Sequence, residues 1–186
     1  MLRSALGIAQ YEYLSGPITG GPRFIRWQEN VGAAAESDES TYQLLLRRQV
    51  IEPNIDELKT RAAKFRETGK HIIEPGSFEA PNDLWSQLEF YRFWEAVIAE
   101  HAKSVIFLDG WHLSVGCTYE FFCAVRAGKP TLNETLEELP PASAAQLIGN
   151  AVAEMSGESQ KLAKHRSRLA SMKEAILFAH NEGPNS

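Results

Sequence analysis

Two glutamates, Glu95 and Glu120, have the residue type and the position that acid–base or nucleophilic chemistry needs. We expect Glu120 in the first turn of a helix, where the helix dipole and free backbone N–H groups favour the carboxylate. We expect Glu95 on the apolar stripe of the preceding helix, where burial would raise the pKa of its carboxyl group. A carboxylate nucleophile beside a proton-donating carboxylic acid is the equipment for cleaving a glycosidic bond. The residues alone also permit a plainer interpretation, in which Glu95 pairs with Arg92 or lies in water at the edge of the stripe.

The predicted elements around Glu120 explain how the two acids would meet. The apolar run at residues 105–108 predicts a strand, the segment 118–127 predicts a helix that ends at Gly128, and residues 131–132 begin another strand. Ligands of such parallel α/β units bind beyond the carboxyl ends of the strands. Because the helix that carries Glu95, predicted over 83–101, leads into the strand, both carboxylates are expected to border one crevice.

A glycine- and proline-rich segment follows the first predicted strand, residues 8–15, and has the sequence Gly16-Pro17-Ile18-Thr19-Gly20-Gly21-Pro22. Glycines allow backbone to come close to a ligand and expose N–H groups to it. The segment matches neither a Walker loop nor a dinucleotide-binding fingerprint. A plain turn between a strand and a helix explains it equally well.

The remaining chain divides into an insertion, a short strand and two C-terminal helices. Residues 24–54 have a poor pattern, and we interpret them as an insertion with a short helix near 40–49 that covers the site as a lid. Asn54 is expected to cap a helix over 55–68, and residues 71–74 predict the short strand. Helices are predicted over 143–155 and 158–180, where the basic residues of the second are most simply a solvated face.

These elements predict an α/β fold: a flavodoxin- or Rossmann-like three-layer sandwich with a parallel sheet, followed by a helical hairpin. The α/β domain is expected to span residues 1–135, with the insertion at about 24–54 inside it. The hairpin is expected to span residues 141–180 and to pack on this domain or on a second subunit. We therefore predict a homodimer or a higher homo-oligomer.

Composition excludes several classes of function. A net charge of −5 and a pI near 5.6 argue against a nucleic-acid polymer or an anionic membrane as partner. No apolar run is long enough to span a membrane, and the N-terminal residues do not resemble a signal peptide, so a cytoplasmic location is expected. The five histidines lack the spacing of metal ligands, and we predict neither a metal nor an organic cofactor.

The two cysteines, Cys117 and Cys123, are expected to be free thiols in a reducing compartment. A cysteine nucleophile is conceivable, with Cys117 near a helix start and His112 as its base. A small buried thiol is the favoured interpretation of Cys117. No Gly-x-Ser-x-Gly elbow marks a serine hydrolase.

Three segments together carry a resemblance to a known family: Tyr13-Leu-Ser-Gly-Pro-Ile-Thr-Gly-Gly, then Ala102-Lys-Ser-Val-Ile-Phe-Leu-Asp-Gly-Trp-His-Leu-Ser-Val-Gly-Cys-Thr-Tyr-Glu, then Ala127-Gly-Lys-Pro. In order and spacing they resemble the nucleoside 2-deoxyribosyltransferase superfamily. Within it they look most like the 2′-deoxynucleoside 5′-phosphate N-hydrolases and related phage and bacterial domains. The resemblance covers residues 9–132 apart from the insertion, and the helical tail lies outside it.

The resemblance implies roles for particular residues. Glu120 matches the glutamate that attacks the anomeric carbon C1′, Glu95 matches its acidic partner, where the family usually has Asp, and Tyr13 matches the tyrosine that orients the nucleophile. It also implies substrate contacts at Gly16, Pro17, Thr19, Gly20, Asp109, Ser114 and Gly116. Ser114 and Gly116 would hold the 5′ end of the substrate. Pro17 and Thr19 stand where the phosphohydrolases have Ser and Arg, so Arg23 or Arg26 would have to replace those phosphate donors.

The function implied is hydrolysis, or base exchange, at the N-glycosidic bond of a nucleoside 5′-monophosphate or a nucleoside. Glu120 would attack C1′, and Glu95 would protonate the base or activate water. The alternative is a nucleotide-binding sensor or accessory protein that keeps the same pocket without turnover.

Overall fold

The computed structural model describes residues 11–78, 85–156 and 159–182. In chain order the elements are β1 (Tyr11–Ser15), α2 (Gly21–Trp27), η1 (Gln28–Gly32), α3 (Ala33–Ala35), α4 (Glu39–Leu46), η2 (Arg47–Ile51), α5 (Glu52–Glu67), β2 (Ile72–Ile73), η3 (Pro75–Ser77), α6 (Gln87–His101), β3 (Ala102–Phe107), η4 (Trp111–Leu113), α7 (Val115–Arg126), β4 (Thr131–Asn133), α8 (Pro141–Glu154) and α9 (Gln160–Glu182). Two of these, η1 and η2, are π-helical turns, and η3 and η4 are 3₁₀ turns.

Four parallel strands form one sheet in the order β2-β1-β3-β4, which is the order of flavodoxin-like folds. In the register, Tyr13 pairs with both Ile73 and Val105, and Val105 pairs with Thr131. The strand order reverses at β1 and β3, so the crevice beyond their carboxyl ends is where this topology binds ligands. The predicted α/β fold with a parallel sheet is confirmed.

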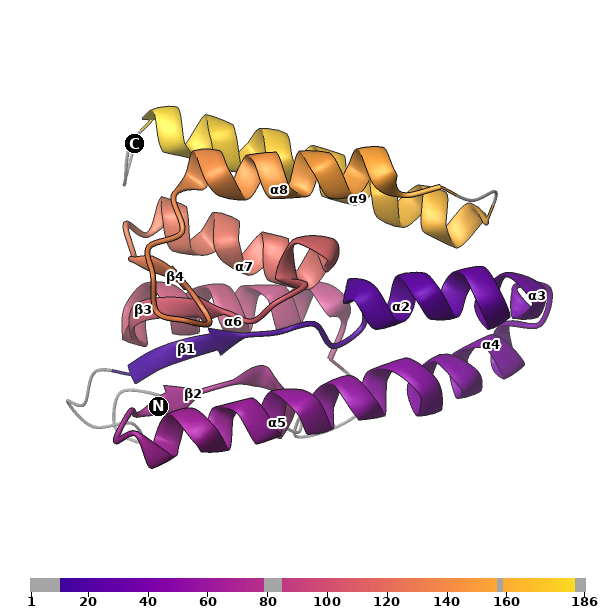
Figure 1. Cartoon of the computed structure of the whole chain (residues 1–186), viewed down its shortest axis with the longest axis horizontal. Coiled ribbons are helices and arrows are strands. Elements are labelled where there is room, and N and C mark those ends of the chain that lie inside the picture. Colours follow the sequence, from indigo (N-terminus) through magenta and orange to yellow (C-terminus); the bar gives the residue numbers. More distant parts are fainter. Residues whose placement is uncertain (1–10, 79–84, 157–158, 183–186) are drawn as a thin grey trace.

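The alternation of side chains along the strands divides the core into two layers. Tyr13 and Phe107 point to the face covered by α6 and α7, and belong to the larger hydrophobic core cluster. Leu14 and Ile106 point to the opposite face, where they pack with Leu58 of α5. Figure 1 shows the resulting sandwich, with α5 on one side of the sheet and α6 and α7 on the other.

The insertion is a helical hairpin, which corrects the prediction of a poorly structured segment with one short helix. One arm runs through α2, η1 and α3, and the other runs from α4 through η2 into α5 without a break. Asn54 therefore lies inside a continuous helix and caps nothing, contrary to the prediction. Figure 1 shows that the hairpin extends past the end of the sheet towards which β1 points.

The helices α6 and α7 begin at serine caps that differ from the predicted starts. Ser86 and Glu89 form a capping box at the start of α6, and Asp83, the expected start, lies outside the described residues. Ser114 caps α7, so that this helix begins at Val115, before the predicted Thr118. This earlier start puts Glu120 in the second turn of α7.

The helices α8 and α9 form the predicted hairpin, and α9 packs along α7 as an outer layer (Figure 1). None of the helices in the described residues is both long and apolar enough to cross a bilayer. At the other edge of the sheet from β2, residues 137–139 fold back beside β4. There the N–H of Asn133 donates to the carbonyl of Glu137, and the N–H of Leu139 donates to the carbonyl of Thr131.

Candidate active site

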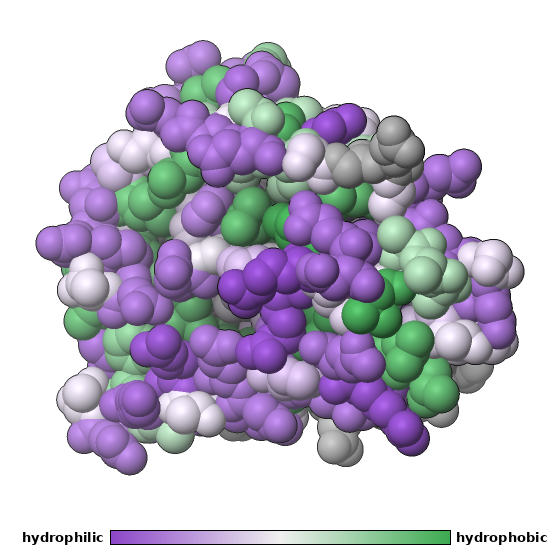
Figure 2. All heavy atoms as spheres, turned by 45° about the vertical axis from the view of Figure 1, so that its right-hand side comes forward, coloured by the Kyte–Doolittle hydropathy of each residue, from purple (hydrophilic) through white to green (hydrophobic). Residues whose placement is uncertain are grey.

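A cavity of about 510 Å³ lies beyond the carboxyl ends of β1 and β3. Its walls come from the loop after β1, from η3, from α6 and from the first half of α7. The residues that line it are Gly16, Ile18, Thr19, Ile55, Pro75, Gly76, Phe78, Trp85, Gln87, Phe90, Tyr91, Trp94, Ser114, Gly116, Cys117, Tyr119 and Glu120. Figure 2 shows the molecule with this end turned forward, where hollows open between hydrophilic residues.

Glu120 is held in this cavity by two hydroxyl groups from β1. Tyr13 Oη donates to Glu120 Oε1 at 2.8 Å, and Ser15 Oγ donates to Glu120 Oε2 at 2.5 Å. Because side chains two apart on a strand share a face, the strand presents both donors to α7 together. The contact expected for Tyr13 is present, and Ser15 is a second partner that sequence reasoning missed, although its place on the same strand face could have indicated it.

Burial dominates the ionisation of this carboxyl group. It raises the pKa of Glu120 from 4.5 to about 7, while the hydrogen bonds from Ser15 and Tyr13 act in the opposite direction. We expected Glu120 in the first turn of the helix, where free N–H groups would stabilise its carboxylate. That placement was wrong, because Glu120 lies in the second turn of α7, beyond the reach of those groups. Burial also raises the pKa of Tyr13 well above 10, so its hydroxyl remains a hydrogen-bond donor.

Glu95 does not line the cavity. Its Oε2 accepts a hydrogen bond from the hydroxyl of Tyr119 at 3.0 Å, and its Oε1 lies 3.7 Å from Arg126 Nη1. The buried face of α6 is formed by Trp94, Val97 and Ile98, so the predicted stripe was right at Ile98 and wrong at Leu88, which is exposed, and at Glu95. The side chain of Glu95 is 37% exposed, and the second acid is therefore separated from the cavity by Tyr119.

Aromatic side chains form most of the wall opposite the glycine-rich loop, and sequence reasoning missed them. Tyr91 stacks on Tyr119 with ring centroids 4.8 Å apart, and the edge of Trp94 meets Tyr13 at 5.7 Å. Phe78 stacks on Phe93 at 4.7 Å. The signal was the density of aromatic residues between positions 85 and 94. Such a wall suits a flat, partly polar ligand.

The loop after β1 is fixed by a residue of the insertion. Asn54 Nδ2 donates to the carbonyl of Ile18 at 2.9 Å and to that of Gly20 at 3.3 Å. A Cβ atom on Gly20 would come within 3.1 Å of Ser114 Cα, so glycine allows the loop to approach the start of α7. The insertion thus holds the loop through Asn54. Its role as a lid remains a prediction.

The predicted substrate-binding residues are spread over three cavities. Gly16, Thr19, Ser114 and Gly116 line the cavity that contains Glu120. Pro17 and Asp109 line a different cavity of about 300 Å³, which Gly16 also borders, and Gly20 lines a third cavity of about 230 Å³.

The arginines expected to replace the missing phosphate donors, Arg23 and Arg26, also lie at that second cavity. Arg23 is already engaged there, since it donates to Asn54 Oδ1 at 2.8 Å and pairs with Glu57 at 3.1 Å. Neither arginine lines the cavity that contains Glu120.

The thiol of Cys117 lies in the wall of the Glu120 cavity but is unsuited to nucleophilic attack. Burial raises its pKa to about 12, so it is a neutral thiol near pH 7. Cys117 and Cys123 are both free, as predicted, and both are buried, as favoured for Cys117. Among the described residues, no group of three or more His, Cys, Asp or Glu side chains is placed to hold a metal ion.

Comparisons with protein-family models, with curated proteins and with solved structures found no match for this chain. The chemistry of the site is therefore inferred from its own geometry: one partly buried carboxylate with two hydroxyl donors, an aromatic wall, and a glycine-bordered opening at the start of α7.

Proposed function

We propose that this protein cleaves the N-glycosidic bond of a nucleoside 5′-monophosphate or a nucleoside, by hydrolysis or by base exchange, with Glu120 as the nucleophile. The observation that carries the proposal is the carboxylate of Glu120, held by Tyr13 and Ser15 in the wall of an aromatic-lined cavity. Two donors fix the orientation of the carboxylate, and a nucleobase is a flat ligand that such aromatic side chains can contact.

The proposed reaction has two steps. An oxygen of the Glu120 carboxylate forms a bond to C1′ while the bond from C1′ to the base nitrogen breaks, and its electron pair leaves with the base, which takes up a proton from water. In the second step, water or the N–H nitrogen of another base attacks C1′ and gives up one proton, which neutralises the hydroxide that the first step left. The ester bond to Glu120 then breaks and the carboxylate is restored.

In this proposal Glu95 is a positioning residue. It accepts the hydrogen bond of Tyr119 and thereby holds that ring against Tyr91 in the cavity wall. The direct role as acid or base that the sequence suggested would require Glu95 to border the cavity, which it does not. We therefore expect Glu95→Gln to impair base release far less than a change at Glu120.

The test is release of free base from a panel of ribo- and deoxynucleosides and their 5′-monophosphates, measured by chromatography. Glu120→Ala and Glu120→Gln should reduce the rate by at least about a thousandfold, because loss of a covalent nucleophile leaves only binding and electrostatic effects. Glu100→Ala is the matched control, since Glu100 is an exposed acid on α6. Circular dichroism should show that the fold of each variant is intact. Turnover at the wild-type rate by Glu120→Ala would refute the mechanism.

A nucleotide-binding sensor without turnover is the second candidate, and one observation favours it: only one of the two expected carboxylates borders the cavity. The same panel separates the two functions. Thermal stabilisation of the wild-type protein by a nucleotide, without any free base after prolonged incubation, would support the sensor.

A further inference from the structure

A smaller recess of about 230 Å³ adjoins the Glu120 cavity at the start of α7. The two share Thr19, Gln87, Tyr91 and Gly116 in their linings. A Cβ atom on Gly116 would meet only Ser114 Oγ within 4 Å, at 3.9 Å, so there is open space beside this shared residue.

One side of the recess is the basic face of α9. Four basic residues of α9 line it, and the intervals 161/164, 161/165, 164/168 and 165/168 are the three- and four-residue spacings of one helical face: Lys161, Lys164, His165 and Arg168. The sequence suggested that this basic run is a solvated surface of the helix. Lys164 and Arg168 are exposed, as that interpretation expects, whereas Lys161 and His165 are partly buried, and all four line the recess because α9 packs beside α7.

Only one of the four basic side chains has an anionic partner within the described part of the chain. Lys161 pairs with Glu39 at 2.8 Å. His165 Nε2 contacts the carbonyl of Leu113 at 2.9 Å, and burial lowers the pKa of its imidazole. Lys164 and Arg168 form no ion pair within the described residues.

The recess also differs from the cavity at Arg23 and Arg26 in the number of acidic residues that line it. No Asp or Glu lines the recess, whereas Glu57, Asp109 and Glu134 line the cavity that contains Arg23 and Arg26. The positive charge of the recess is therefore not neutralised by its own walls. An anion of small cross-section is the ligand that fits such a lining.

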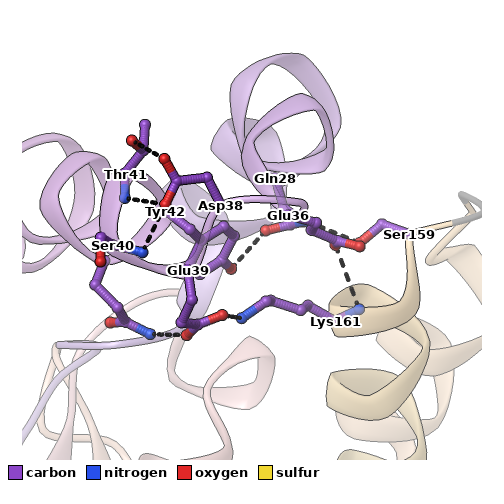
Figure 3. Close-up of polar contacts among 10 residues, drawn as sticks. Gln28, Glu36, Asp38, Glu39, Ser40, Thr41, Tyr42, Ser159 and Lys161 are labelled. Carbon is purple, nitrogen blue, oxygen red and sulfur yellow. Dashed lines mark hydrogen bonds and ion pairs between the residues drawn. The ribbon is translucent and has the colours of Figure 1, made fainter.

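A buried polar network fixes the start of α9, and with it the basic face (Figure 3). Glu36 Oε1 accepts from Gln28 Nε2 at 2.6 Å, from Ser159 Oγ at 2.5 Å and from the N–H of Lys161 at 3.4 Å. Gln28 is fully buried, and its Oε1 accepts from Tyr42 Oη at 2.7 Å. The insertion thus holds α9 in place, so the recess is a built feature of the fold.

The recess is bordered by Gly116, one of the two residues that the family resemblance implies at the 5′ end of the substrate. Gly116 and Glu120 are one turn apart on the same face of α7, about 6 Å along its axis. A sugar whose C1′ faces Glu120 can therefore direct its 5′ oxygen towards Gly116 and Ser114. A phosphate chain that continues from there enters the recess beside Lys164 and Arg168.

We propose that Lys164 and Arg168 bind the β-phosphate, and any phosphate beyond it, of a nucleoside di- or triphosphate whose sugar lies at Glu120. This assignment rests on the proposed function for the position of the sugar. It changes that function in one respect, because the substrate becomes a nucleotide with more than one phosphate in place of a nucleoside or its 5′-monophosphate. It also gives α9, which lies outside the family resemblance, a direct part in ligand binding.

The experiment uses the full chain with Glu120→Gln, so that binding is measured without turnover. Titration calorimetry compares nucleosides with their 5′-mono-, di- and triphosphates, and inorganic tripolyphosphate with orthophosphate. The di- and triphosphates should bind at least about tenfold more tightly than the monophosphate, as expected for one or two added charge-assisted contacts. Lys164→Ala with Arg168→Ala should remove this difference and leave the affinity for the nucleoside unchanged.

The matched control is Lys59→Ala with Lys173→Ala, which changes the net charge equally at sites away from the recess. Equal binding of mono-, di- and triphosphates would overturn the proposal, as would an unchanged preference in the Lys164 and Arg168 variant. If no nucleoside or nucleotide binds, the proposed function fails. Binding of tripolyphosphate then tests separately whether the recess is an anion site. Tripolyphosphate binding that the variant abolishes would support the anion site, and equal or absent binding would reject it.

Discussion

The burial of Glu120 predicts a stability that depends on pH in an unusual direction. The pKa of this carboxyl group is 4.5 in an unfolded chain and about 7 in the folded protein, because burial disfavours its charged form. Between these values the folded state binds more protons than the unfolded state, so the stability falls as the pH rises. The contribution is fully present below pH 4.5 and is lost as the pH rises through about 7.

The size of this effect follows from the two pKa values. Each unit of pKa difference corresponds to about 1.4 kcal/mol, which makes the loss about 3 kcal/mol between the two limits. Tyr13 and Cys117 do not contribute in this range, because burial raises the pKa of each far above 7. Glu120→Gln keeps the shape of the side chain and removes the titration.

The assay is unfolding by urea at a series of pH values from 4.5 to 8, followed through the fluorescence of the four tryptophans. The quantity of interest is the free energy of unfolding of the wild type minus that of Glu120→Gln, since all other titrating groups cancel. This difference should decline by about 3 kcal/mol as the pH rises. A difference that stays constant across the range would refute the argument that burial controls this carboxyl group.

Two further perturbations test the contacts around the site. Tyr13→Phe removes a hydrogen-bond donor to the Glu120 carboxylate and should raise the pKa of Glu120 further. In a pH profile of kcat/KM for base release, the rising limb should then move to higher pH by about one unit. A profile that does not move would contradict a role of Tyr13 in setting this pKa. Gln28→Ala breaks the network between the insertion and α9 and should lower the free energy of unfolding by about 2 kcal/mol. Gln43→Ala, which removes one exposed hydrogen bond to Glu39, should change it by less than about 0.5 kcal/mol, and an equal effect of the two would count against the network.

The sheet followed from patterns that a sequence carries directly, whereas the contact between Tyr13 and Glu120 was expected only from the family resemblance. Apolar runs of strand length, each ended by glycine or proline, marked β1 and β3, and helices between them required a parallel arrangement. Strand alternation then directs Tyr13 towards the helix that carries Glu120. Ser15 obeys the same alternation, and a stricter use of it would have identified both donors.

The phase of α6 could not be read from its sequence, because apolar residues occur on almost every side of that helix. A stripe through Leu88 and Glu95 fitted the spacing, yet Leu88 is 56% exposed. The side of α6 that faces the sheet contains Trp94, whose ring packs against Tyr13 of β1. Such a choice depends on a contact between distant segments, which helical periodicity does not contain.

The insertion escaped prediction for a related reason. Its polar residues are typical of a loop, which is why a helical hairpin was not expected. Two of them, however, form hydrogen bonds with Ser159: Glu36, 123 positions away in the sequence, and Gln28, 131 positions away. Two π turns also shift the helical phase at Gln28–Gly32 and Arg47–Ile51, which blurs the pattern of buried positions. Long-range polar pairs and phase shifts leave no local signal.

The return of residues 137–139 along β4 determines how this sheet can meet other chains. Exposed strand edges are templates onto which a peptide or a second sheet can add by backbone pairing. At β4 the protein's own segment already occupies that place, with an antiparallel bridge between Leu132 and Glu138. A strand from another molecule cannot extend the sheet there unless it first displaces this segment. The chain thereby protects this border against fibril-like stacking with its own backbone.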